Sequence, residues 1–181
     1  MKAPYLIGQL VYLRAIDSAD AGELQAFINH PEVRRHIQAW RPASLENETE
    51  FIGRTGRSET DVVLGIARRN EDGLIGVCGL HQIDWQNRCA KFGIAIGVIE
   101  EWGKGYGTEA TRLITGYGFD RLNLHRIELD VYSPNARGIR AYEKVGYRRE
   151  GVLREGVFRD GAWLDVHRMA ILESEWRAQA R

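Results

Sequence analysis

The sequence predicts an α+β fold with three α/β layers, in which helices cover both faces of a mixed, mostly antiparallel central sheet of about seven strands. Three observations favour this class. Turn residues at 70–73 (Asn-Glu-Asp-Gly) and at Gln86 and Asn87 join strand-like runs into hairpins. A third hairpin turn, Arg159-Asp160-Gly161, lies near the end of the chain. Segments with apolar residues at helical spacing alternate with these strands.

The first third of the chain is predicted to be mostly helical, because three segments begin with residues that favour a helix start. Helices are expected over 17–29, for a short turn from Pro31, and from Ser44 to about Arg57. A strand over 10–16 precedes them. We expect these helices to cover one face of the sheet.

An antiparallel meander of three strands follows, over 61–69, 74–85 and 89–98. The third strand alternates apolar side chains with small residues, which is the period-two pattern of a strand. A helix is predicted from Gly107 to about Leu122, because apolar residues recur there at i, i+3, i+4 and i+7. The third strand of the meander is therefore followed directly by the start of a helix.

Between that strand and that helix lies a glycine-rich loop, residues 98–110 (Val-Ile-Glu-Glu-Trp-Gly-Lys-Gly-Tyr-Gly-Thr-Glu-Ala). Its glycines let the backbone approach a ligand closely. The first amides of a helix lack intrahelical partners and the helix dipole adds partial positive charge there, so the loop is predicted to bind a phosphate or pyrophosphate. Lys104 either adds a cation at the rim or is a solvated loop lysine.

Two common phosphate-binding motifs do not fit this loop. A Walker loop needs Gly-Lys-Ser/Thr after its spacer, whereas Gly105 is followed by Tyr106. A dinucleotide fingerprint needs a glycine or alanine where this chain has Thr108, and it opens a parallel fold rather than a meander of hairpins.

The rest of the chain is predicted to contribute three strands and one helix. The strands are expected over 126–132, 147–158 and 162–172, and the helix begins at Asn135 and ends where Gly146 closes it. No repeat or linker interrupts the sequence. We therefore expect a single domain over 1–181.

Two motifs in this order resemble the GCN5-related N-acetyltransferase (GNAT) superfamily. The loop is similar to its pyrophosphate motif, Gln/Arg-x-x-Gly-x-Gly/Ala, with Gly105 and Gly107 in the glycine slots and Trp102 in the first slot. That tryptophan is usual in the branch of ribosomal-protein N-terminal acetyltransferases and spermidine acetyltransferases. Residues 135–147 (Asn-Ala-Arg-Gly-Ile-Arg-Ala-Tyr-Glu-Lys-Val-Gly-Tyr) resemble the later signature of the family. The likeness spans a core of about 10–175.

The resemblance implies a GNAT fold in which the glycine-loop strand and the next strand run parallel but splay apart. Acetyl-CoA would lie in this gap, with its pantetheine arm along the first of these strands and its pyrophosphate on the loop amides. The residues that the resemblance assigns to the cosubstrate are Ile96, Gly97, Val98, Trp102, Gly103, Lys104, Gly105, Tyr106, Gly107, Thr108 and Asn135.

The resemblance also assigns a catalytic acid, Tyr142, which would protonate the departing thiolate. A phenol (pKa about 10) and a thiol (about 8.5 for cysteine) are close enough for this transfer. The general base is left open. Relatives often carry a glutamate where this chain has Lys91, so His81 or Asp84 on the preceding strand is expected to take that role.

Acceptor recognition is expected from the helical first third and the last hairpin. The first hypothesis is acetyl transfer by direct attack of a primary amine, with a protein or peptide N-terminal amine as acceptor. A polyamine such as spermidine, or another small amine, is the alternative, for which Glu46, Glu48 and Glu50 offer only part of an acidic cluster. A non-catalytic acyl-CoA-binding module is the hypothesis of another class.

Composition excludes other functions. The chain has 25 Lys and Arg residues against 25 Asp and Glu residues, which argues against a nucleic-acid or membrane partner. No run approaches a membrane span, so a cytoplasmic protein is expected. Cys78 and Cys89 are expected as reduced thiols, and the five histidines show no metal-binding spacing. Members of the family are often dimers, and a homodimer is an expectation here, although no apolar stripe in the sequence requires one.

Overall fold

The computed structural model describes residues 2–179 and contains an eight-stranded sheet in the order β1-β2-β3-β4-β5-β6-β8-β7. Its strands are β1 (Leu6–Ile7), β2 (Val11–Arg14), β3 (Val62–Arg68), β4 (Leu74–Asp84), β5 (Cys89–Ile96), β6 (Arg126–Tyr132), β7 (Arg148–Arg159) and β8 (Ala162–Leu172). Its helices are η1 (Ser18–Asp20), α1 (Ala21–Asn29), α2 (Pro31–Arg34), α3 (Leu45–Thr55), η2 (Ile99–Glu101), α4 (Tyr106–Asp120), α5 (Ala136–Val145) and α6 (Glu173–Ala178).

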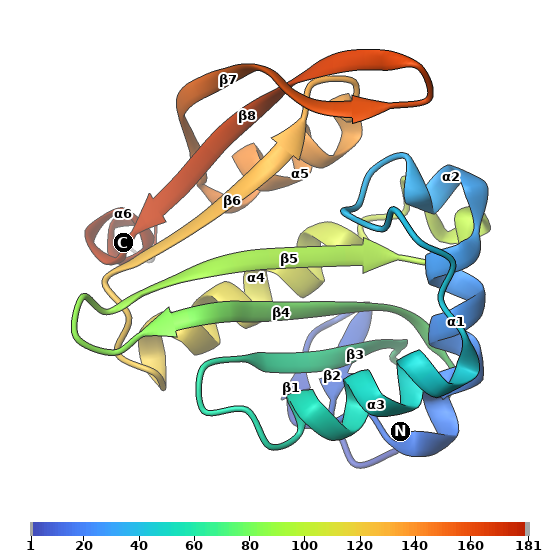
Figure 1. The fold of residues 1–181 in the computed structure, drawn as a ribbon. Helices are drawn as coiled ribbons and strands as arrows, with labels where there is room; N and C mark the ends of the chain where they lie inside the picture. The colour runs from blue at the N-terminus through green and yellow to red at the C-terminus, as the bar shows by residue number, and fades with distance from the viewer. Residues whose placement is uncertain (1, 180–181) are drawn as a thin grey trace.

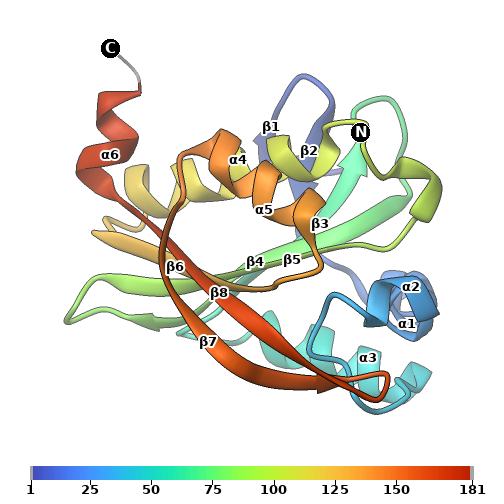
Figure 2. The same ribbon diagram turned by 90° about the horizontal axis from the view of Figure 1, so that it is seen from above.

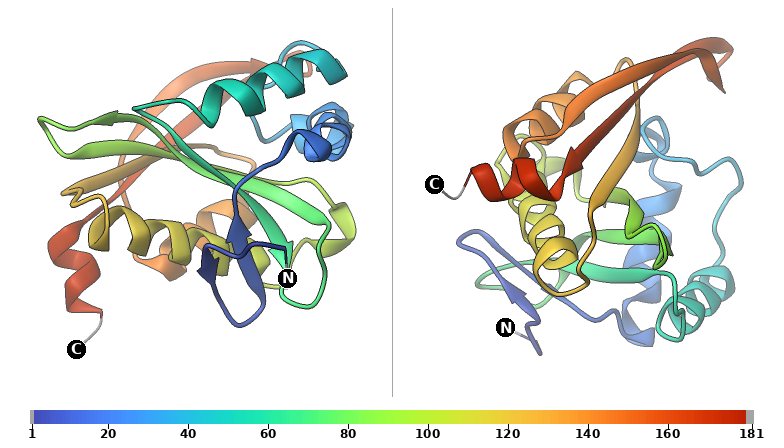
Figure 3. Two further views of the ribbon diagram at one scale, coloured as in Figure 1. Left: turned by 90° about the horizontal axis from the view of Figure 1, so that it is seen from below. Right: turned by 90° about the vertical axis from the view of Figure 1, so that its left-hand side faces the viewer.

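The helices form two layers around the sheet, as predicted. Helices α4 and α5 cover one face, and α1, α2 and α3 lie on the other (Figures 1 and 3). The larger apolar cluster joins α4, α5 and the middle strands, and the smaller one joins α1 and α3 to β2, β3 and β4. The tip of the β7–β8 hairpin reaches across to the segment after α2 (Figure 2), where Arg159 donates to the Ile37 carbonyl oxygen at 3.0 Å.

Local capping signals placed the helices correctly. Ser44 accepts a hydrogen bond from the Asn47 amide, and Asn135 accepts one from the Gly138 amide. The sequence did not predict β1 and α6, which have two and six residues, respectively. Elements this short carry too few residues for a periodic pattern.

Strands β5 and β6 form the parallel pair of the sheet, and they separate after a short contact. Only Cys89–Lys91 pairs with Arg126–Glu128, whereas β6 pairs with β8 along its whole length. Beyond Lys91, the edge of β5 that faces β6 has no neighbouring strand, and β6 leans away from it (Figure 1). The splayed pair that the sequence predicted is therefore present.

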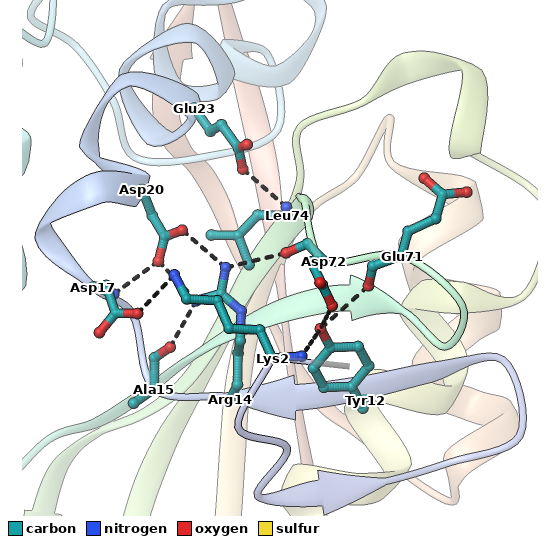
Figure 4. Close-up of polar contacts among 10 residues, drawn as sticks. All are labelled: Lys2, Tyr12, Arg14, Ala15, Asp17, Asp20, Glu23, Glu71, Asp72 and Leu74. Atoms are coloured by element: carbon teal, nitrogen blue, oxygen red, sulfur yellow. Dashed lines mark hydrogen bonds and ion pairs between the residues drawn. The ribbon is translucent and has the colours of Figure 1, made fainter.

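A buried ion pair ties the first helices to the sheet (Figure 4). Arg14 on β2 is only 2% exposed, and both of its terminal nitrogens donate to Asp20 at 2.8 Å. Asp20 also accepts from the Asp17 amide at 2.7 Å, and Glu23 accepts from the Leu74 amide at 2.9 Å. These bonds fix the start of α1 relative to β2 and β4.

Phe27 on α1 lies against Gly97 and belongs to the smaller apolar cluster of the core. A Cβ atom at Gly97 would lie 1.9 Å from Phe27 Cγ. We expect Gly97→Ala to lower the free energy of unfolding by about 1–3 kcal/mol, because α1 must move to relieve the overlap. Urea denaturation measures this. Gly22→Ala, where nothing lies within 4 Å of the added atom, is the control and should not destabilise the fold.

Candidate active site

A cavity of about 770 Å³ lies where β5 and β6 separate. Side chains and backbone from α2, β4, β5, the glycine loop, β6 and α5 line it. It therefore joins the two sequence motifs, residues 98–110 and residues 135–147, which are separated by a helix and a strand along the chain.

The glycine loop adopts the backbone conformation that its glycines predict. Gly103 and Gly105 have φ values of +82° and +93°, a region that side-chain-bearing residues rarely adopt. Gly105 caps α4, and residues 106–108 of its first turn line the cavity. Because amides in a first turn have no intrahelical partner, this end of the cavity can bind an anion.

Trp102 connects the loop to three other elements. Its indole Nε1 donates to the Ile96 carbonyl oxygen at 2.9 Å, and the Arg137 guanidinium lies 3.8 Å above its ring. The His36 ring approaches its edge, with the centroids 6.0 Å apart. Burial and the neighbouring Arg137 lower the pKa of His36, which favours its neutral form at pH 7.

The acids of the loop have a structural role that the sequence did not reveal. Glu101 is 7% exposed and forms ion pairs with Arg68 at 2.9 Å and Lys104 at 3.2 Å. Lys104 is thus held by Glu101 and lies outside the cavity lining.

The structure brings most, but not all, of the predicted cosubstrate residues to the cavity. Gly97 and Val98 lie outside it, because their amides point to the Ile75 carbonyl oxygen of β4, at 2.8 and 3.4 Å. The predicted residues that do line the cavity are Ile96, Trp102, Gly103, Gly105, Tyr106, Gly107, Thr108 and Asn135.

Three cations on α5 were missed by the sequence analysis. Arg137, Arg140 and Lys144 line the cavity at i, i+3 and i+7, so they share one side of the helix. None forms an ion pair with another residue in the described range 2–179. Their spacing after Asn135 was a visible signal in the sequence. Together with the first turn of α4, these residues fit a ligand that carries several phosphates.

Tyr142 lies on α5 at the base of the cavity. Its side chain is 9% exposed, and its ring contacts Phe92 edge-on, with the centroids 6.0 Å apart. Burial raises its pKa to about 12. Its hydroxyl forms no hydrogen bond with the residues that the structure describes, unlike that of Tyr147, which lies 2.9 Å from Thr115 Oγ1. The Tyr142 hydroxyl is therefore a neutral donor that has no acceptor among the described residues.

His81 faces the cavity from the opposite face of the sheet. Its Nδ1 lies 3.2 Å from Asp61 Oδ1, and its Nε2 lies above two glycines. A Cβ atom would lie 2.8 Å from Nε2 at Gly79 and 3.5 Å from it at Gly93, so glycine leaves room for the imidazole. The next residue, Gln82, sits in a bulge with φ of +51°.

Asp61 holds this arrangement together. It accepts from the Gln82 amide at 3.3 Å and from Ser58 Oγ at 2.7 Å, in addition to its contact with His81. Burial opposes its ionisation, but the hydrogen bonds from Ser58, Gln82 and His81 outweigh burial and lower its pKa. An ionised carboxylate can only accept, so Nδ1 of His81 carries the proton of this hydrogen bond, and in the neutral tautomer that this selects, Nε2 is the acceptor.

The structure does not bring Asp84 to the cavity. Its carboxylate accepts from the Asn87 amide at 2.8 Å and from the Asn87 side chain at 2.7 Å in the β4–β5 turn. Glu46, Glu48 and Glu50 also lie outside the lining, and Glu48 alone is buried while the other two are exposed. Lys91, in contrast, lines the cavity beside His81.

A sequence profile described as "Acetyltransferase (GNAT) domain" matches residues 11–148. This chain belongs to the GNAT acetyltransferase family. It is therefore an acetyl-CoA-dependent N-acetyltransferase, and the cavity with its glycine loop is the place where a GNAT enzyme is expected to hold this cosubstrate. The predicted family and fold are confirmed.

Relatives of the chain include enzymes with named acceptors. The spermidine N(1)-acetyltransferase of Vibrio cholerae is 37% identical over 170 residues, which cover 91% of this chain and 94% of that protein. The probable N-acetyltransferase YjcK of Bacillus subtilis is 32% identical over 179 residues, 94% of this chain and 98% of that protein. A crystal structure of the Vibrio cholerae spermidine N-acetyltransferase in complex with CoA and spermine has a TM-score of 0.85 and 27% identity, covering 94% and 99% of the two chains.

Two further observations concern the described residues only. Between residues 2 and 179, no His, Cys, Asp and Glu side chains gather in a group of three or more that could hold a metal ion. The helices in this range all lack the length or the apolar character needed to cross a bilayer.

Proposed function

We propose that this GNAT enzyme transfers the acetyl group to a primary amine by direct attack, with His81 as general base and Tyr142 as general acid. The observation that carries this proposal is the cavity itself. It places an imidazole on one face of the sheet and a buried phenol on the other, at the point where β5 and β6 separate.

The base acts first, because an amine must be neutral to attack a thioester. The Nε2 lone pair of His81 removes a proton from the ammonium, directly or through a water molecule. Asp61 is a positioning residue. It fixes the tautomer through Nδ1 and faces the imidazolium that forms, which stabilises the added charge.

The acid acts last, when the carbon–sulfur bond breaks and the thiolate leaves. A phenol with a pKa of about 12 would be a poor donor to a thiolate in water. Burial raises the pKa of a thiol as well as that of a phenol. In this core, for example, burial raises the pKa of the Cys78 thiol. A thiolate released in this cavity therefore also becomes more basic. The pKa values of the Tyr142 phenol and the departing thiol stay close, so the proton can pass between them.

Two acceptor classes are proposed for testing. The relatives named as spermidine acetyltransferases support a polyamine. The N-terminal amine of a protein or peptide is the other candidate, supported by the likeness of Trp102 and its neighbours to the branch that contains such enzymes.

An amine panel tests the proposal. Release of free CoA thiol from acetyl-CoA is measured with spermidine, small monoamines and peptides with free N-termini. Turnover with at least one primary amine supports the enzyme. Binding of acetyl-CoA without turnover of any amine would instead identify a non-catalytic acyl-CoA-binding module.

Replacing the positioning residue gives a sharper test of the base. Asp61→Asn is expected to lower kcat/KM by about tenfold, which corresponds to ~1.4 kcal/mol. The loss should appear in kcat while the Kd for acetyl-CoA stays near the wild-type value, because the imidazole loses the group that fixes its tautomer. The measurements are kcat and KM under saturating acetyl-CoA, with titration calorimetry for the Kd.

Asp84→Asn is the matched control for Asp61→Asn, since it removes a carboxylate at the end of the same strand but outside the cavity. It should leave kcat near the wild-type value. If Asp61→Asn also keeps the wild-type kcat, Asp61 does not act through His81.

A further inference from the structure

The acids that line the cavity all contact protein groups. Asp61 contacts His81, and the buried Glu101 is bound by Arg68 and Lys104. On β6, Glu128 pairs with Arg126 at 3.0 Å, an arginine that it shares with Glu150, and Asp130 forms two hydrogen bonds of 3.0 Å with Arg168. Each lining carboxylate within residues 2–179 therefore already has a protein partner.

The cations of the cavity show the opposite pattern. Lys91, Arg137, Arg140 and Lys144 line it, and none of the four forms an ion pair inside the described part of the chain. The last three lie along α5, where Arg137 stacks on Trp102 of the glycine loop. Those three lie where the phosphates of the cosubstrate are expected, but Lys91 does not.

Lys91 lies in the acceptor half of the cavity. Lys91 lies five residues before Ile96 on β5, which is about 17 Å along an extended strand. Ile96 is the end of β5 that leads into the glycine loop. Lys91 pairs in register with His81 on β4 and with Glu128 on β6. Phe92, the next residue, points to the α4 and α5 face, so Lys91 and His81 share the other face.

In this placement, an imidazole that can accept a hydrogen bond from an amine lies beside a lysine that can bind an anion. Directly paired residues on one face of a sheet have Cβ atoms about 5 Å apart. The Asp61–His81 pair can accept hydrogen bonds from an ammonium, and Lys91, which forms no ion pair within residues 2–179, is the direct cross-strand neighbour of His81. The imidazole lies over Gly79 and Gly93.

We propose that the acceptor is an amine that also carries a carboxylate, and that Lys91 binds this carboxylate while the amine faces His81. This inference rests on the proposed acetyl transfer. It sets the enzyme apart from the spermidine acetyltransferases to which it is similar. A polyamine would bring a second positive charge towards Lys91, whose ammonium forms no ion pair within residues 2–179 and would repel it.

Amines matched in length test this inference with the full-length enzyme. The primary series is 5-aminopentanoate, pentylamine and 1,5-diaminopentane, which differ only in whether the distal group is negative, neutral or positive. Spermidine is included. A second arm compares a free α-amino acid with its amide, and a peptide with aspartate in its second position with the asparagine peptide. This arm separates an amino-acid substrate from a peptide substrate.

The wild-type enzyme should prefer the carboxylate member of each pair by at least about tenfold in kcat/KM, as one direct ion pair in a partly enclosed site permits. Lys91→Glu should reverse the order, so that the diamine is acetylated faster than the amino acid. Lys91→Met should remove the preference without reversing it. Arg154→Glu reverses an exposed charge on β7 outside the cavity and should leave the order unchanged.

The experiment distinguishes failure of the proposed role of Lys91 from failure of the proposed acetyl transfer. A wild-type preference for spermidine or the diamine, or a ranking unchanged by Lys91→Glu, overturns the role of Lys91 while acetyl transfer stands. Binding of acetyl-CoA with no turnover of any amine overturns the proposed function and this inference with it. Equal Kd values for acetyl-CoA in wild type and Lys91→Glu would support the acceptor-side placement, and a large loss of affinity would contradict it.

Discussion

Replacement of Tyr142 by phenylalanine is expected to lower kcat by about 100- to 1,000-fold, the lower part of the range that a positioned general acid contributes. The Kd for acetyl-CoA should change little, because the change removes one hydroxyl and keeps the ring that contacts Phe92. Thiol release under saturating amine measures kcat, and titration calorimetry measures the affinity. A loss confined to kcat identifies an interaction that is made in the transition state.

Tyr147→Phe is the control for this variant. It removes a second buried phenol of the same core, but one whose hydroxyl is bound to Thr115 and lies outside the cavity lining. It should lower stability more than turnover. Wild-type kcat in Tyr142→Phe would exclude the acid role and would leave Tyr142 as a packing residue.

The pH dependence of the acid step follows from its raised pKa. With a pKa of about 12, the Tyr142 phenol stays protonated at all pH values at which the protein is assayed, and loses its proton only as the pH rises through that value. We therefore expect no basic limb from Tyr142 below about pH 10 in kcat. A basic limb near neutral pH that disappears in Tyr142→Phe would contradict this assignment.

Introducing an acid into the glycine loop should have an effect of similar size on cosubstrate binding. Gly105→Asp is expected to raise the Kd for acetyl-CoA by at least about 100-fold, or ~2.7 kcal/mol. The nearest side-chain atom to an added Cβ is Leu10 Cδ1 at 3.4 Å, which is an ordinary van der Waals contact. The loss arises because a carboxylate would sit at the start of α4, where the diphosphate is expected to lie.

Gly161→Asp is a closely matched control for backbone strain. Gly161 has a φ of +84°, against +93° for Gly105, and lies in the β7–β8 turn with nothing within 4 Å of an added Cβ. Both variants carry the same substitution in the same backbone region, but only one alters the cavity. An unchanged Kd in Gly105→Asp would refute the placement of the pyrophosphate, whereas equal losses in both variants would point to strain alone.

Most of the fold was determined by local sequence signals. Caps such as Ser44 and Asn135 set helix starts, and turn residues at 70–73 and 159–161 set hairpins. These signals act between residues a few positions apart, so one sequence is enough to read them. The glycine loop belongs to this group, because its alternate glycines already specify the positive φ values of Gly103 and Gly105.

The partners of the site were decided by tertiary structure. Asp61 and His81 are 20 residues apart and meet only because β3 and β4 pair in one register. Asp84 and His81 appeared equivalent in the sequence, yet a bulge at Gln82 and the Asn87 turn send Asp84 away from the cavity. Neither the Asp61–His81 contact nor the position of Asp84 outside the cavity can be predicted from residues that are close in the sequence.

The pairing of charges in the cavity also became visible only in three dimensions. The sequence shows that acids and bases are equal in number, but it does not show which are paired. Strand register places Arg168 on Asp130 and leaves Lys91 without a partner among residues 2–179. Local propensity therefore determined the elements and the phosphate loop, whereas long-range pairing determined which charges face the substrate, because an ion pair depends on distance in space and not on separation along the chain.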